Sequence, residues 1–167
     1  MKFSFSFKCA LVSAGIFIAI KLATFFTHTQ LIGVGTYANL IALGLTSIPL
    51  YIGIKQKRDK ELGGYITLRQ SFLAGVAISL QASLFAAIYT YLHNSFIDTE
   101  VIAYWTQEAK RVGAEMHKSE TEIQSFIDFY SPFHQAIAAL MGILGAGALL
   151  SFIISTILVR KADDIES

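Results

Sequence analysis

The sequence predicts an all-α integral membrane protein, a four-helix bundle with an external amphipathic helical insert between its third and fourth helices. The chain of 167 residues is 54% hydrophobic and only 15% charged, whereas soluble domains are about a quarter charged. Its charges lie in blocks that are separated by four long apolar runs. Each run reaches the ~20 residues that a helix needs to cross a bilayer core. We therefore treat residues 1–167 as a single membrane domain.

The first two runs predict membrane helices at about residues 9–27 and 31–54. Because the connection between them is very short, the two helices should form an antiparallel pair. A cleaved signal peptide is the alternative for the N-terminus, since Lys2 and Lys8 precede an apolar stretch. Against cleavage, no clean site with small residues follows, and Lys21 interrupts the apolar run.

The second and third runs are separated by a basic segment, Lys55–Arg69, with five Lys and Arg residues. Thr67 and Gln70 have the spacing of a capping box, in which each side chain bonds the backbone N–H of the other residue. The third membrane helix is therefore predicted at about residues 67–93.

Residues 94–131 form a polar segment with seven acidic and three basic side chains. Apolar residues recur in it at spacings of three and four, which is typical of an amphipathic helix. They are Trp105, Ala109, Val112, Met116, Ile123, Phe126 and Tyr130. Ser119 and Glu122 form a second capping box. The segment should therefore contain two outer helices, at about residues 99–116 and 120–130.

The fourth membrane helix is predicted at about residues 132–159. Ser131 is suited to cap it, and Pro132 to occupy its first position. Nine Lys and Arg residues belong to the two termini and the basic segment, against three in residues 94–131. The positive-inside rule therefore places both termini in the cytoplasm and the insert outside.

Small residues at four-residue intervals predict close helix–helix contacts, because membrane helices associate mainly where their backbones can approach. This packing could lie within one bundle, or it could form a homodimer or dock a partner. The predicted packing positions are Ser71, Gly75, Ser79, Ser83 and Ala87 on the third helix, and Gly142 and Ala146 on the fourth.

Several short motifs resemble an uncharacterised four-helix membrane family of Bacteroidota, catalogued as domain of unknown function 4199. They are Ile52-Gly53-Ile54-Lys55, Arg58-Asp59, Gly64-Tyr65-Ile66-Thr67, Gln70-Ser71-Phe72 with Gly75, and Ser119-Glu120-Thr121-Glu122-Ile123. The resemblance covers nearly the whole chain. It implies a bacterial inner-membrane protein with an external helical insert, and it implies no activity and no functional residues.

The polar residues predicted within the membrane are the candidate site residues. Lys21 is the only charge deep in a predicted membrane helix, and such charges are functional hypotheses by default. Its stem could instead snorkel to the interface, or its ammonium could pair with an outer acid such as Asp98 or Asp128. Asn39 and Gln81 could form interhelical hydrogen bonds, or could line a transport path with Lys21.

The sequence predicts no catalytic, cofactor-binding or metal-binding residue. It contains no nucleophile elbow, phosphate-binding loop or dinucleotide fingerprint, and the single Cys9 excludes a disulfide framework. The four histidines map to the outer side without metal-site spacing. An enzyme acting on lipid would need an acid–base pair such as His134 and Asp128. A net charge of +1 argues against a nucleic-acid partner.

The leading hypothesis is a non-catalytic structural or accessory subunit, whose insert lies on membrane lipids or binds a membrane-protein partner or a second copy. The alternative is an oligomeric small-molecule transporter or channel. The shape of the bundle discriminates between them. A closed, dry bundle favours the accessory role, a polar cavity that reaches Lys21 favours transport, and an outer cleft with His134 against Asp128 favours chemistry.

Overall fold

A computed structural model describes residues 4–29 and 34–160. Within these ranges the regular structure is helical, apart from one isolated antiparallel bridge between Ile66 and Arg160. In chain order the elements are α1 (Phe5–Phe26), α2 (Val34–Gln56), η1 (Lys57–Glu61), α3 (Leu68–Leu92), η2 (His93–Ile97), α4 (Thr99–Glu115), α5 (Glu120–Phe129) and α6 (Pro132–Leu158). The two η elements are π-helical turns.

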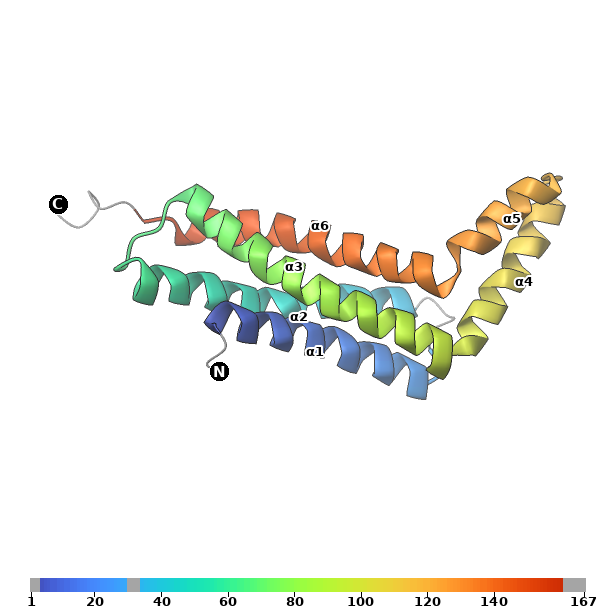
Figure 1. The fold of residues 1–167 in the computed structure, drawn as a ribbon, viewed down its shortest axis with the longest axis horizontal. Coiled ribbons are helices and arrows are strands. Elements are labelled where there is room, and N and C mark those ends of the chain that lie inside the picture. Colours follow the sequence, from blue (N-terminus) through green and yellow to red (C-terminus); the bar gives the residue numbers. More distant parts are fainter. Residues whose placement is uncertain (1–3, 30–33, 161–167) are drawn as a thin grey trace.

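Four of the described helical segments are long and apolar enough to cross a membrane. They are Phe5–Phe26, Tyr37–Glu61, Leu68–Ile97 and Pro132–Leu158. The other two helices, α4 and α5, lie side by side and lean away from the bundle (Figure 1). The predicted all-α membrane fold with an insert between the third and fourth spans is confirmed. We call the end that carries α4 and α5 the hairpin end, and the end that carries η1 the basic end.

The helix starts follow from local hydrogen bonding. Thr67 and Ser119 begin α3 and α5 with complete capping boxes, as predicted, and Ser131 caps α6 ahead of Pro132. The predicted start of the first helix at residue 9 is wrong. Helix α1 begins at Phe5, because the Ser4 hydroxyl accepts a hydrogen bond from the Phe7 amide at 3.3 Å. The predicted start of the second helix at residue 31 lies outside the described residues.

The basic segment is more helical than the sequence predicted. Helix α2 runs on through Lys55 into η1, because Lys, Arg and Glu are good helix formers whose charges can project into water. The chain reverses at Gly63 and Gly64, whose φ angles of +67° and +95° are accessible to glycine. Ile66 then exchanges two backbone hydrogen bonds of 3.1 Å with Arg160, which ties this turn to the end of α6.

The third membrane span is also longer than predicted. Helix α3 passes directly into η2, so the helical path extends from Leu68 to Ile97 instead of ending near residue 93. The Asp98 carboxylate then caps α4 by accepting a hydrogen bond of 3.2 Å from the Val101 amide. The hairpin therefore joins the bundle with a single residue between two helical elements.

The membrane helices pack most closely toward the basic end. Helix α3 contacts α6 extensively, α1 contacts both α2 and α3, and the contact of α2 with α6 is slighter. A continuous apolar core fills the basic end. It consists of Cys9, Ala10, Leu50, Ile54, Ile66, Ala74, Ile78, Ala82, Ile154 and Leu158. The guanidinium of Arg58 also reaches the Leu158 carbonyl at 3.4 Å, near the end of α6.

Candidate functional site: a cavity inside the bundle

A cavity of about 770 Å³ lies among the four membrane helices. Its volume falls in the range of roughly 300–1,000 Å³ that is usual for small-molecule sites. Lys21 of α1 and Asn39 of α2 both line it, together with residues of α3, η2, α4 and α6. The bundle is therefore not closed and dry: a polar cavity reaches the one charge that the sequence places deep in a membrane helix.

The two ends of the cavity differ in polarity. Toward the basic end its walls are mainly apolar and include Leu43, Leu50, Ile78, Ala82, Ala146 and Leu150. The three hydroxyl residues among them, Ser13, Thr46 and Ser79, donate to carbonyls of their own helices. Toward the hairpin end they are polar and include Lys21, Asn39, Thr90, His93, Asn94, Asp98 and Gln135. The polar residues gather there because each lies near the end of its helix that meets the hairpin. A ligand with an apolar part and a polar part matches this division.

Hydrogen bonding separates the polar wall into two groups. Thr24 of this wall, like Thr46 farther toward the basic end, donates to a carbonyl of its own helix, at 2.9 and 2.8 Å respectively. In contrast, Thr90 Oγ1, His93 Nε2 and Asn94 Oδ1 are buried and have no hydrogen-bond partner among the described residues. An unpaired buried polar group costs about 1–3 kcal/mol. Three such groups within five residues mark this wall as the place where a polar ligand would gain most.

His93 is the centre of the polar wall. Its side chain is 1% exposed, and its Nδ1 lies 3.0 Å from the Tyr89 hydroxyl. The Phe25 ring packs edge-on against the imidazole, with ring centroids 5.4 Å apart. The other nitrogen, Nε2, lies 3.9 Å from Oδ2 of Asp98. The imidazole is thereby held in one orientation, with Nε2 toward the residue that begins the hairpin.

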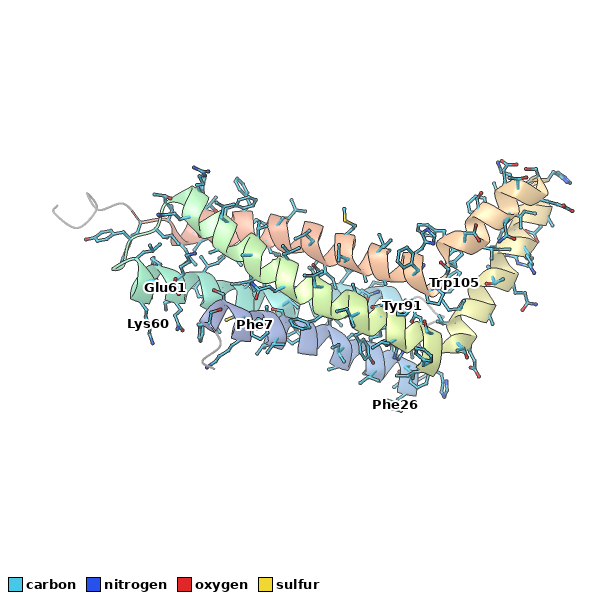
Figure 2. The ribbon with its side chains drawn as sticks, in the orientation of Figure 1. Phe7, Phe26, Lys60, Glu61, Tyr91 and Trp105 are labelled. Atoms are coloured by element: carbon cyan, nitrogen blue, oxygen red, sulfur yellow. The ribbon has the colours of Figure 1, made fainter. Side chains whose placement is uncertain are left out.

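The base of the hairpin borders this end of the cavity, through Val101 and Trp105 of α4. Trp105 of α4 lines the cavity and stacks on Tyr130, with ring centroids 5.4 Å apart and planes 10° from parallel. Figure 2 shows Trp105 where the hairpin meets the bundle. Farther out, α4 and α5 approach closely at Gly113, where an added Cβ would lie 2.5 Å from Ile123 Cγ1. Part of the predicted apolar stripe is therefore used in holding α4 against α5.

Charged side chains on the hairpin pair along its outer faces. Arg111 bonds Glu115 at 2.6 Å, and Lys118 bonds Glu122 at 2.9 Å. The Lys118 ammonium and the Ser119 cap lower the pKa of Glu122 to about 2. A hydrogen bond from Arg111 likewise lowers the pKa of Glu108. These exposed pairs each contribute little to stability, and none of them lines the cavity.

Two of the three predicted intramembrane polar residues are brought together, and the third is not. Lys21 and Asn39 line the same cavity. Gln81 does not line it, and its amide donates to the Ala77 carbonyl of its own helix at 3.0 Å. Within one chain Gln81 does not share this cavity, because its side chain leaves α3 on a different face from Ala82 and Ala86. A path that Gln81 lines in an oligomer stays a prediction.

The small residues predicted on the third helix are all buried: Ser71, Gly75, Ser79, Ser83 and Ala87. A Cβ added at Gly75 would collide with Ser151, and one at Gly147 would collide with Ser79. Helices α3 and α6 therefore interlock through alternating glycine and serine.

The packing predicted for Gly142 and Ala146 does not occur within this chain. Gly142 is exposed and has no atom within 4 Å of an added Cβ, and Gly142 and Ala146 line the cavity. Their packing against a second copy or a partner stays a prediction. Gly147, which also lines the cavity, and Ser151 make the close contacts with α3. Each residue turns a helix by about 100°, so Gly147 points to a different side of α6 from Gly142.

The other candidate sites do not assemble. His134 Nδ1 lies 2.9 Å from the Ser131 hydroxyl, while Asp128 accepts a hydrogen bond from Gln124 at 2.9 Å. Within residues 4–29 and 34–160 no ion pair joins His134 to Asp128. The same residues contain no cluster of three or more His, Cys, Asp or Glu side chains placed to hold a metal ion.

Sequence reasoning missed the wall formed by Thr90, His93 and Asn94. It placed His93 at the membrane interface and treated Asp98 only as a possible partner of Lys21. The sequence pattern that could have indicated it is the group of polar residues at the end of the third apolar run. This pattern does not predict that a π-helical turn continues α3 and directs these residues toward the cavity.

The fold and the cavity define a multi-pass α-helical membrane protein. The profile of DUF4199, described as a protein of unknown function, matches residues 8–160, and the chain belongs to that family. No curated protein matches the chain. No solved structure matches it either.

Proposed function

We propose that this protein is a non-catalytic carrier that binds a small molecule in its central cavity and moves it between the membrane and the surface next to the hairpin. The observation that carries the proposal is the cavity of about 770 Å³ that reaches Lys21 and Asn39. Charged side chains within membrane spans are rare, and they characteristically mark pathways for substrates or ions. Because this polar cavity is present, we propose transport in place of the accessory role that the sequence favoured.

The distribution of exposed residues around the cavity supports a lateral route for the ligand. Among the described lining residues, the exposed ones are Asn39, Leu40, Ala138 and Gly142. They belong to α2 and α6, the pair that packs less closely than α3 with α6. The apolar core blocks the basic end. A ligand would therefore reach the cavity through the side that faces lipid.

Two glycines of α6 provide a matched test. Gly142 lines the cavity, whereas Gly145 does not, and a Cβ at either position meets no atom within 4 Å. A leucine at Gly142 should project into the cavity and obstruct it, and a leucine at Gly145 should project away from it. Native mass spectrometry of protein extracted with its lipids should detect a bound small molecule on the wild type and on Gly145→Leu, but not on Gly142→Leu.

Two results would contradict the carrier proposal. One is a wild-type protein that retains no small molecule, and the other is equal retention by the two leucine variants. Once the molecule is identified, its transfer between vesicles containing the protein should be lost in Gly142→Leu and kept in Gly145→Leu.

The proposed location is the bacterial inner membrane, with both termini in the cytoplasm. Positive charge supports it, because seven of the described Lys and Arg residues lie at the basic end: Lys8, Lys55, Lys57, Arg58, Lys60, Arg69 and Arg160. In a Cys9→Ser background, a membrane-impermeant thiol reagent should label Lys110→Cys in intact cells. It should label Lys60→Cys only after lysis, and the reverse pattern would overturn the orientation.

An accessory role is the second candidate, and exposed apolar residues on the hairpin favour it. Met116, Phe126 and Phe129 are 63%, 50% and 56% exposed. They would contact membrane lipids, a second copy of the chain or a membrane-protein partner; no nucleic acid is expected. Crosslinking in native membranes would capture a stoichiometric partner if this role is correct. Extraction of the protein alone would count against it.

A further inference from the structure

The charges at the polar end of the cavity are balanced. Of the described residues that line it, Lys21 carries a positive charge and Asp98 a negative one, while other Lys, Arg, Asp and Glu side chains are absent from its walls. Asp98 is 3% exposed. Buried charges are stable only when they are paired. An anionic ligand would pair with Lys21 and be repelled by Asp98, and a cationic ligand would do the reverse. A zwitterion can pair with both residues.

The ammonium of Lys21 is available to such a ligand. Within the described parts of the chain it makes no hydrogen bond and no ion pair shorter than 4.0 Å. An anionic group of the ligand would therefore find an unshared cation on α1. Ion pairs in an apolar setting are strong when both members are otherwise unpaired.

Asn94 and Asp98, the acceptors at the polar end of the cavity, require hydrogen-bond donors from the ligand. Asn94 Oδ1 is a buried acceptor without a partner, and Oδ2 of Asp98 lies 3.9 Å from His93 Nε2, which is longer than a hydrogen bond. A primary ammonium carries three donors and no acceptor. It could donate to Asn94 and to Asp98 together, whereas a quaternary ammonium has no N–H to donate.

The rest of the cavity requires an apolar tail. Its walls toward the basic end are mainly aliphatic, and the serine and threonine hydroxyls there already bond carbonyls of their own helices. Its exposed lining residues lie on α2 and α6. A water-soluble zwitterion would leave the aliphatic section without contacts. A membrane amphiphile would fill both sections and would approach from the bilayer.

From these four observations, and resting on the proposed carrier function, we infer that the ligand is a membrane amphiphile with a zwitterionic headgroup. In this headgroup an anionic group pairs with Lys21, and a primary ammonium pairs with Asp98 and Asn94. Its apolar chain occupies the section lined by Leu50, Ile78 and Leu150.

Trp105 gives a direct readout, because it is the single tryptophan of the chain and lines the polar end. The purified full-length protein in a maltoside detergent is titrated with lysophosphatidylethanolamine, and its tryptophan emission is recorded. Lysophosphatidylcholine and lysophosphatidylglycerol with the same acyl chain are the comparison probes. The ethanolamine lipid should give a saturable change, at a half-saturating mole fraction about tenfold below that of either comparison lipid.

Two variants test the assigned contacts. Lys21→Met should raise the half-saturating fraction of the ethanolamine lipid by about tenfold, as expected for the loss of a charged hydrogen bond. Asp98→Asn keeps a good helix cap but removes the negative charge, and it should shift the preference toward the anionic glycerol lipid. Gly145→Leu should behave like the wild type.

The inference is overturned if the three lipids act alike, if the glycerol lipid binds best to the wild type, or if Asp98→Asn leaves the order of preference unchanged. These results differ from failure of the carrier proposal. If native mass spectrometry shows a molecule that Gly142→Leu loses, but the lipids show no preference for ethanolamine, the cavity binds a ligand of another class.

Discussion

The two halves of the bundle are built from the same four helices but use small residues in opposite ways. In the basic half Gly75 faces Ser151, and at mid-bundle, on the edge of the cavity, Gly147 faces Ser79, so small residues bring α3 and α6 together. In the hairpin half, Gly142 faces no neighbouring atom within 4 Å and borders the cavity. A small residue therefore indicates close packing only where a second helix fills the space beside it.

The two halves also differ in what they contribute to the stability of the fold and to ligand binding. The basic half contains the apolar core, and two of its buried serine hydroxyls, those of Ser71 and Ser155, lack partners among the described residues. Within the same described part of the chain the hairpin half has no such core, and three of its buried polar groups, all within five residues on one wall of the cavity, lack partners. Such groups reduce stability, and functional sites commonly retain them because a ligand gains from pairing with them. We expect the basic half to hold the fold together while the hairpin half tolerates changes that alter binding.

The largest expected effect is at Gly75. Gly75→Leu should lower the free energy of unfolding by about 2–3 kcal/mol, because overpacking a filled contact forces the backbones apart, and the new side chain would meet Ser151 and Ile54. Unfolding in mixed micelles, followed by circular dichroism, measures the change. Gly142→Leu is the control and should alter stability by less than about 0.5 kcal/mol. Equal losses in the two variants would remove the distinction between the halves.

A second effect concerns the contact between the two helices of the hairpin. Gly113→Leu should destabilise the contact of α4 with α5 by about 1–2 kcal/mol, because Ile123 occupies the space beside Gly113. Separation of the helices should also break the stacking of Trp105 on Tyr130. Tryptophan emission reports this separation. Ala114→Leu, on the exposed side of α4, should leave the emission unchanged, and a shift equal to that of Gly113→Leu would argue against the contact.

A smaller effect is expected at the start of α5. Ser119→Ala removes the side chain that caps the Glu122 amide, and the loss of such a cap costs about 1 kcal/mol. Hydrogen exchange of the α5 amides should accelerate, while that of α3 should not change. Ser119→Asp restores a capping oxygen and should restore the protection. Global loss of protection in Ser119→Ala would mean that the hairpin is not a separate unit.

The smallest effect is a pH dependence confined to the hairpin. The pKa of Glu122 is about 2 in the folded chain, below its ordinary value of 4.5. Its pairing with Lys118 therefore stabilises α5 fully above pH 4.5 and is lost as the pH falls toward 2. Protection of the α5 amides should decline across this interval, and Glu122→Gln should flatten the decline. An unchanged decline in that variant would assign it to another group.

Much of the fold was predictable because it depends on interactions that are local in sequence. The four spans follow from apolar run length, and the capping boxes at Thr67 and Ser119 involve residues three apart. The insert between the third and fourth spans follows from its charge and from the three-and-four spacing of its apolar residues. Errors at the helix ends, as at Phe5 and Ile97, arose where capping or a π-helical turn extended a run.

The sequence by itself determined the helices, their order and their membrane character, because hydrophobicity and hydrogen bonding along one chain suffice for them. The cavity was decided by tertiary structure. Whether Gly142 packs or lines a cavity depends on how α2 and α6 are placed, and whether Asp98 approaches His93 and lines the same cavity as Lys21 depends on a π-helical turn and on the angle of the hairpin. These are relations between helices, and the spacing of residues within one helix does not contain them.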